Sequence, residues 1–217
     1  MDALILSLAP EQHKKYLELL KQENITLDFK VDKIEFNNYS DENVKNAKYK
    51  IVAYCEKLMI FAKNDSFFSK KLSKDEIDML IPEYFGAINS ISIIQRELYT
   101  EAIIVSRKIN EVEKIHIEIS KKYTDFLPYK AAFGKNEKYQ DEISIIDSEF
   151  NREIEKALEQ KKVLANELAR ISTICDVLIP SFRKNSSRAA DTPRFQNFND
   201  KEFFNSVSAF MEQIKSV

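Results

Sequence analysis

Apolar side chains recur at steps of three and four residues along two long stretches of the chain. In the first stretch these positions are Ile91, Ile94, Leu98, Ala102, Val105, Ile109, Val112, His116, Ile119, Tyr123 and Phe126. In the second they are Tyr139, Ile143, Ile146, Phe150, Ile154, Ala157, Lys161, Leu164, Leu168, Ile171, Cys175 and Leu178. Each series has a 3.5-residue period with one additional four-residue step, which indicates a stutter in a heptad repeat. The pattern predicts two long helices, at about 83–127 and 138–180.

The residues between these two stretches are few and contain Pro128 and Gly134. A short link makes consecutive helices antiparallel neighbours, so we expect a long, coiled-coil-like hairpin. Gly134 can adopt the left-handed conformation that ends a helix. Because Pro82 and Gly86 lie near the start of the first helix, we predict a hinge there and a turn at Pro128 and Gly134.

Shorter amphipathic patterns predict flanking helices at 10–22, 41–63, 75–80 and 200–216. The predicted fold is therefore all-α: a single elongated domain, 1–217, made of an N-terminal subregion (1–82), the hairpin (83–180), a flexible linker (181–198) and a C-terminal amphipathic helix (199–217). Residues 25–36 instead alternate apolar and polar side chains, the period of a strand. Three structures fit them: a small β-hairpin turning at Asp32 and Lys33, a strand paired with another chain, or an extended segment lying on the helices.

Composition excludes several other folds. Only two of the 217 residues are glycine, and Rossmann units, P-loops and all-β sandwiches need glycine at tight turns. The 33 basic and 35 acidic residues are evenly spread, whereas nucleic-acid binding requires a concentrated basic face. The N-terminus lacks the basic region of a signal peptide, and the uncharged stretch Tyr84–Gln95 is too short to span a bilayer. We predict a soluble cytoplasmic protein, with export that needs no signal as an alternative.

Candidate chemistry is sparse. Glu113 and His116 have the spacing of a di-iron helix motif, but the second copy that such sites use is missing. A polar residue at an inward heptad position more often sets helix register, which is the role we predict for His116 and Lys161. Cys55 and Cys175 lie on apolar stripes and are expected to be buried thiols, with a disulfide as the alternative. We expect no metal, no cofactor and no enzymatic activity.

The function predicted from these patterns is a non-enzymatic interaction or scaffold protein that associates with itself or with a partner helix. Candidate partner contacts are His116, Lys161, Phe203, Phe204 and Phe210. The aromatic side chains that cluster at helix ends, Phe203 and Phe204 among them, are expected first to fill the core where helices cross, and to anchor a partner where they are exposed. The alternative is a membrane-active helical protein, such as a subunit of a pore-forming assembly or a curvature sensor, in which Tyr84–Gln95 inserts. An enzyme whose site is built from dispersed residues is a third hypothesis, and fold-level analogy alone assigns none of them.

Overall fold

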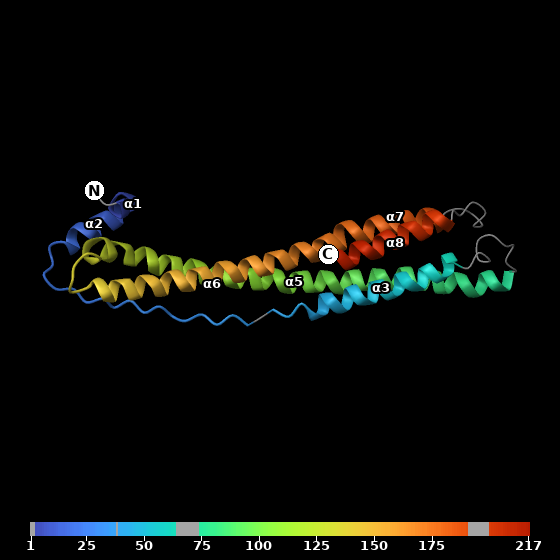
Figure 1. Cartoon of the computed structure of the whole chain (residues 1–217), viewed down its shortest axis with the longest axis horizontal. Helices are drawn as coiled ribbons and strands as arrows, with labels where there is room; N and C mark the ends of the chain where they lie inside the picture. The colour runs from blue at the N-terminus through green and yellow to red at the C-terminus, as the bar shows by residue number, and fades with distance from the viewer. Residues whose placement is uncertain (1–2, 38, 64–73, 191–199) are drawn as a thin grey trace. The chain divides into compact units, whose positions relative to one another are not determined.

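The computed structural model describes residues 3–37, 39–63, 74–190 and 200–217, and shows an all-α fold (Figure 1). None of these described residues is in a β-strand. The helices are α1 (Ala3–Ser7), α2 (Pro10–Leu19), α3 (Glu42–Lys63), α5 (Lys74–Phe133), α6 (Gln140–Ser172), the π-helix η1 (Thr173–Leu178), α7 (Ile179–Ala190) and α8 (Asp200–Ser216).

The chain divides into two compact units, each built from two separate stretches of sequence. Unit 1 comprises residues 1–38 and 108–164, and unit 2 comprises residues 39–107 and 165–217. The helices α5 and α6 each contribute residues to both units.

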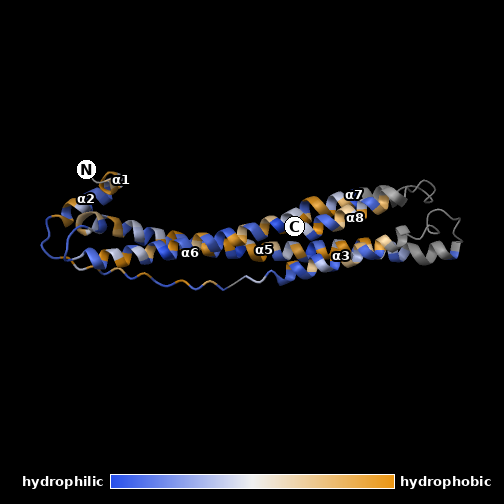
Figure 2. Cartoon of the chain, viewed as in Figure 1, coloured by the Kyte–Doolittle hydropathy of each residue, from blue (hydrophilic) through white to orange (hydrophobic). Residues whose placement is uncertain are grey.

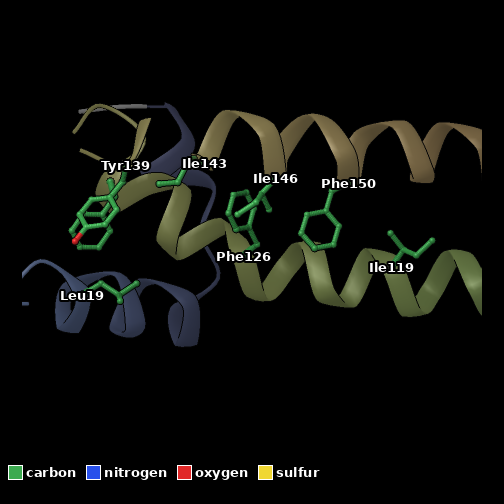
Figure 3. Close-up of a cluster of buried hydrophobic side chains, with 8 residues drawn as sticks. Leu19, Ile119, Phe126, Tyr139, Ile143, Ile146 and Phe150 are labelled. Carbon is green, nitrogen blue, oxygen red and sulfur yellow. The ribbon is translucent and has the colours of Figure 1, made fainter. Parts of the chain in front are cut away.

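The predicted antiparallel hairpin is confirmed. In unit 1 the ring of Phe126 on α5 lies 5.7 Å from that of Phe150 on α6, and Phe133 at the end of α5 lies 5.4 Å from Tyr139 just before α6. Figure 3 shows how side chains from both arms of this hairpin meet Leu19 of α2 in one cluster. The buried members are Leu19, Ile119, Phe126, Phe133, Tyr139, Ile143, Ile146 and Phe150.

One series of buried residues runs along each long helix at strict seven-residue spacing, and most of these residues belong to the predicted series; the predicted stutters stay predictions. On α5 every seventh residue is buried: Tyr84, Ile91, Leu98, Val105, Val112, Ile119, Phe126 and Phe133. The same spacing continues through α6 and η1 at Ile143, Phe150, Ala157, Leu164, Ile171 and Leu178. Figure 2 shows the resulting alternation of hydrophobic and hydrophilic residues along α5 and α6. At the four-residue steps after Leu98 and Phe150, the buried side chains are Glu101 and Glu153, one residue before the predicted inward positions. Farther along α5, the half-buried Tyr123 packs on the cluster while Lys122 is exposed.

Three prolines predicted to bound the helices lie inside helical segments instead. Pro82 and Pro128 are interior to α5, and Pro180 follows the first residue of α7. A proline in a helix lacks the N–H that would bond to a carbonyl one turn earlier. At Pro128 that carbonyl belongs to Thr124, and Gln12 Nε2 donates to it at 2.7 Å. The backbone therefore continues through Pro128 with its freed acceptor satisfied.

Glycine is used differently from the prediction. Gly86 lies within α5, and a Cβ there would meet no atom within 4 Å. Gly134 directly follows α5, where its N–H donates to the Lys130 carbonyl at 2.9 Å. Its backbone is not in the left-handed region; the constraint is instead a close approach, because an added Cβ would lie 2.5 Å from the Lys130 oxygen. The turn at Gly134 is present, and the hinge at Pro82 and Gly86 stays a prediction.

In unit 2 the C-terminal helix is part of the core. Helix α8 packs against α3, α7 and η1, and Phe210 of α8 stacks on Phe182 of α7 with ring centroids 4.4 Å apart. The predicted linker at 181–198 is wrong in its first half, because α7 extends to Ala190. The rest of that linker, 191–198, lies outside the described residues.

Candidate functional sites: an extended segment and buried polar groups

Residues 25–36, here called the extended segment, lie on the helices of unit 1 as the third sequence alternative proposed. Ile25, Leu27, Phe29, Val31 and Ile34 pack against the buried cluster of Figure 3, while the residues between them are exposed. Phe29 contributes most directly. Its ring meets those of Phe126 and Tyr129 edge-on at 5.2 and 5.0 Å. The β-hairpin alternative is wrong, since no described residue forms a strand beside the segment.

Two hydrogen bonds fix the ends of the extended segment. The N–H of Ile25 donates to the Tyr139 hydroxyl at 3.2 Å, and that of Ile34 donates to Glu153 Oε2 at 3.0 Å. Between these ends, the backbone groups of residues 26–33 form no hydrogen bond within the described part of unit 1. The segment is thus anchored by its apolar side chains, by its ends and by the ion pair of Asp32 with Lys122 Nζ of α5 at 2.8 Å, with most of its backbone unpaired.

Glu153 is the acceptor that holds the C-terminal end of the segment. Its side chain is fully buried, and it also accepts hydrogen bonds from Arg152 Nε at 3.0 Å and from Lys156 Nζ at 3.0 Å. Burial raises the pKa of Glu153, but the Ile34 N–H and the two cations together outweigh burial and leave the pKa below its usual value. Glu153 is therefore a buried carboxylate that is charged at neutral pH and bound to the segment.

An ion pair joins the two arms of the hairpin. Lys161 Nζ of α6 donates to Glu113 Oε2 of α5, and this hydrogen bond is the main cause that lowers the pKa of Glu113. The structure thus brings together two residues that the sequence singled out separately. His116 is half-buried one turn along α5 from Glu113. Among the described residues, no three His, Cys, Asp or Glu side chains are grouped so that they could hold a metal ion.

Unit 2 contains two buried carboxylates from facing helices. Glu101 of α5 accepts hydrogen bonds from the Tyr39 hydroxyl at 2.9 Å and from Asn43 Nδ2 at 3.0 Å. Glu167 of α6 pairs with Arg170 at 2.7 Å through Oε2, and its buried Oε1 has no hydrogen-bond partner among the described residues. Arg170 Nε in turn donates to the carbonyl of Val217 at 2.7 Å. These contacts tie the segment before α3 and the end of α8 to the two long helices.

The π-helix η1 is held to α5 by a buried glutamine, Gln95. Ile179 N–H bonds to the Ile174 carbonyl, five residues earlier, which is the π-helical register. In that register the N–H of residue 180 would donate to the Cys175 carbonyl, but residue 180 is a proline and has no N–H. Gln95 Nε2 of α5 donates to the Cys175 carbonyl instead, at 2.5 Å.

Both cysteines are buried free thiols. Burial, with a smaller contribution from Asp176, raises the pKa of Cys175 to about 12, and burial beside Glu56 raises that of Cys55 to about 12. A protonated thiol is neither a nucleophile nor a metal ligand. The two side chains therefore act as small apolar core residues.

The aromatic candidates for partner contact lie largely inside unit 2. Phe203 and Phe210 are buried, at 5% and 3% exposure, and Phe203 lies 5.7 Å from the ring of Tyr84. Phe204 is half-buried. The burial of Phe203 agrees with the expectation that the clustered aromatic side chains fill the core, and the partner contacts of these residues stay a prediction.

The outer face of α5 in unit 2 carries the exposed apolar side chains instead. Ile93, Ile103 and Ile104 are 55%, 53% and 39% exposed. At 3.6 residues per turn they fall within an arc of about 100° of the helix, with Arg96 and Thr100 between them. Arginine is enriched at protein interfaces, and their buried centres are more apolar than the rest of a protein surface.

Sequence reasoning missed the buried carboxylates. Glu101, Glu153 and Glu167 are buried one residue before the positions that had been assigned inward, namely Ala102, Ile154 and Leu168. A strict heptad extrapolated from the apolar residues on either side would have found all three. Apolarity alone could not, because a carboxylate is buried only when specific donors surround it.

Comparisons with protein-family models, with curated proteins and with solved structures find no match for this chain. Across the described helices, none has the length and apolar character to cross a bilayer.

Proposed function

We propose that this protein is a non-enzymatic helical interaction protein, which binds a partner helix or a second copy of itself. The observation that carries the proposal is the outer face of α5 in unit 2, where Ile93, Ile103 and Ile104 are exposed. The heptad-spaced apolar side chains of α5 and α6 are buried within the chain itself. A partner would therefore bind the outer face of α5 without opening the hairpin. Burying the three isoleucine side chains would supply the apolar centre of an interface.

The polar interior supports a structural role for the helices. Gln95, Glu101, Glu153 and Glu167 each form hydrogen bonds that join one segment of the chain to another or to a neighbouring cation. Such groups fix register and pairing between helices at some cost in stability. They are consistent with a rigid scaffold that presents its surface in one conformation.

The membrane-active alternative would require a large rearrangement. Within the uncharged stretch Tyr84–Gln95, the side chains of Tyr84, Ala87, Ile91, Ile94 and Gln95 are buried in unit 2. Inserting this stretch into a bilayer would remove them from the core. Incubation of the full chain with vesicles of neutral and of anionic lipids, followed by sedimentation, tests this alternative directly.

The test of the proposed interaction compares three single substitutions on one helix. Ile93→Glu and Ile103→Glu each place a charge in the proposed face, and Ile117→Glu places one at a residue of α5 that is equally exposed, at 57%, but lies in unit 1. We expect affinity purification from the source cell, and sedimentation of the purified chain, to lose complexes with the first two variants and to keep them with the third. Complexes that survive Ile93→Glu and Ile103→Glu would refute the proposed surface.

A further inference from the structure

A groove runs between α3 and α5 in unit 2, where the two helices lie side by side (Figure 1). Its volume is about 700 Å³, within the range of clefts that bind ligands. Its buried lining residues are Ala47, Leu98 and Glu101. Its exposed lining residues are Asn43, Asn46, Tyr49, Lys50, Glu97 and Thr100.

Glu101 is the buried carboxylate of this groove. Its partners are two neutral donors, the Tyr39 hydroxyl at 2.9 Å from Oε1 and Asn43 Nδ2 at 3.0 Å from Oε2. Both oxygens therefore accept hydrogen bonds, which is the arrangement of an ionised carboxylate. Burial, together with the hydrogen bond to Glu101, raises the pKa of Tyr39 and keeps its hydroxyl a neutral donor. Glu101 is 7% exposed and its hydrogen-bond partners bring no positive charge.

Glu101 differs in this respect from the other buried glutamates. Glu153 and Glu167 each pair with cations of their own helix. Glu101 forms no ion pair with a described residue, and Lys50 of the same groove pairs instead with Glu97, at 3.7 Å. A buried charge without a countercharge is unfavourable. A cation that enters the groove would offset this cost.

We infer that the groove binds an arginine side chain of the protein partner, with its guanidinium on the Glu101 carboxylate. Each carboxylate oxygen has a second lone pair with which to accept it. A guanidinium donates to a carboxylate through two parallel N–H groups and is more weakly hydrated than an ammonium, so it suits a partly buried site.

Other groups of the groove complement a guanidinium. The side-chain carbonyl of Asn46 forms no hydrogen bond with a described residue and is an acceptor for a further N–H. The Thr100 hydroxyl donates to the Arg96 carbonyl at 3.2 Å, which leaves its oxygen as a second acceptor. The ring of Tyr49, 76% exposed, offers a face on which a guanidinium stacks.

The surroundings of the groove favour an arginine that is part of a polypeptide. Ile104 lies one turn along α5 from Glu101, and Ile93 lies one turn before Glu97. Both isoleucines are exposed and would contact the residues that flank the arginine. A free amino acid would also bring an α-carboxylate, and Lys50, the cation that lines the groove, is already paired with Glu97.

This inference rests on the proposed function, because the arginine belongs to the partner that binds the outer face of α5. The site itself is tested on the purified chain with a small probe, without the complexes that test the isoleucine face. If the probe fails, the arginine site is refuted and the isoleucine face stands. If the isoleucine variants fail, the face is refuted whatever the probe shows.

The test is a titration of the full-length chain with N-acetylarginine methylamide, a single arginine residue with both backbone ends blocked. The matched control is N-acetylcitrulline methylamide, which has nearly the same shape and no charge. At constant ionic strength, the NMR signals of the side-chain amides of Asn43 and Asn46 should shift saturably with the arginine probe. We expect the citrulline probe to bind at least about tenfold more weakly, because it lacks charge-assisted hydrogen bonds to Glu101.

Substitutions locate the site. Glu101→Gln removes the carboxylate and should weaken binding of the arginine probe about tenfold or more. Glu42→Gln makes the same change of net charge at an exposed residue of α3 that does not line the groove, and should leave binding unchanged. Asn46→Arg keeps Glu101 and its hydrogen bonds intact, so it tests the site even if Glu101→Gln unfolds. The introduced guanidinium should block the probe and raise the melting temperature, whereas Asn46→Gln should do neither.

Several results would overturn the inference. They are the absence of saturable shifts with the arginine probe, equal affinity for the citrulline probe, and affinity for the arginine probe that Asn46→Arg leaves unchanged. Tighter binding of free arginine than of the blocked probe would indicate a small-molecule site and would refute the assignment to a partner residue. Partner complexes that are lost with Ile93→Glu should also be lost with Asn46→Arg and kept with Asn46→Gln; complexes that survive Asn46→Arg would refute the same assignment.

Discussion

Replacing Gln95 by leucine removes the side-chain donor that takes the place of the Pro180 N–H in unit 2. Gln95 Nε2 lies 2.5 Å from the Cys175 carbonyl, and both residues are buried. The Tyr99 hydroxyl is 3.5 Å from the same carbonyl, but it donates to Asp176 Oδ1 at 2.6 Å. In Gln95→Leu the Cys175 carbonyl therefore stays buried without a strong donor, which costs about 1–3 kcal/mol of unfolding free energy.

A second substitution isolates this cause. Pro180→Ala gives residue 180 an N–H in reach of the same carbonyl, so that Gln95 becomes dispensable. We expect Gln95→Leu to cost at least about 1 kcal/mol less in the Pro180→Ala background than in the parent, the size of one net hydrogen bond. Urea unfolding of the parent, of Gln95→Leu, of Pro180→Ala and of the double variant gives this coupling energy, when one m-value is fitted to all four proteins.

The hydrogen bond of Gln12 at Pro128 is an exposed counterpart of the buried bond of Gln95 at Pro180. Gln12 donates to the Thr124 carbonyl, which Pro128 leaves free, but that bond is exposed. Gln12 Oε1 also accepts the Ala9 N–H at 2.8 Å at the start of α2, so the control is Gln12→Glu, which keeps this acceptor and removes the donor. Water can replace the lost donor, so Gln12→Glu should cost about 0.5 kcal/mol or less. Equal costs for Gln95→Leu in both backgrounds, or a cost for Gln12→Glu as large as that for Gln95→Leu, would refute the argument.

Three further predictions concern stability and reactivity. Gly134→Ala should lower the melting temperature, because the new Cβ would lie 2.5 Å from the Lys130 oxygen; Gly86→Ala, where a Cβ meets nothing within 4 Å, is the control and should leave the melting temperature equal or higher. The lowered pKa of Glu153 means that its contribution to stability is present above the pKa of an unfolded glutamate and is lost as pH falls through the lower folded value. Urea unfolding from about pH 7 to about pH 3 should therefore show a shallower loss of stability for Glu153→Gln than for the parent. Because burial raises the pKa of Cys55 and Cys175 to about 12, both thiols should react with a disulfide reagent at the rate of unfolding; rapid labelling of the folded chain would contradict their burial.

The helical fold could be predicted because the heptad spacing depends on backbone geometry alone. The apolar residues from Ile91 to Phe126 specify one face of a helix whatever lies opposite it. The ends of the helices could not be predicted from proline, because the cost of Pro128 depends on whether a distant side chain reaches the Thr124 carbonyl. Gln12 does so across 112 residues of sequence.

The candidate sites were predictable to a smaller extent. Lys161 stood out as a charge at an inward position, and the structure supplies its partner, Glu113. Glu153 did not stand out, since its donors come from the Ile34 backbone and from its own helix, and a backbone donor has no sequence signature. The alternation of residues 25–36 indicated an extended chain, but only the structure shows what covers its apolar face.

The anchoring of the extended segment has a consequence for the order of folding. Its two end bonds join residues 114 and 119 positions apart, from Ile25 to Tyr139 and from Ile34 to Glu153, whereas the hairpin of α5 and α6 closes over the short link at Gly134. Closing a long loop costs more entropy than closing a short one, and the contacts that the segment makes exist only after the hairpin has formed. The segment therefore docks after the hairpin during refolding, and it can open in the native state with the hairpin intact beneath it.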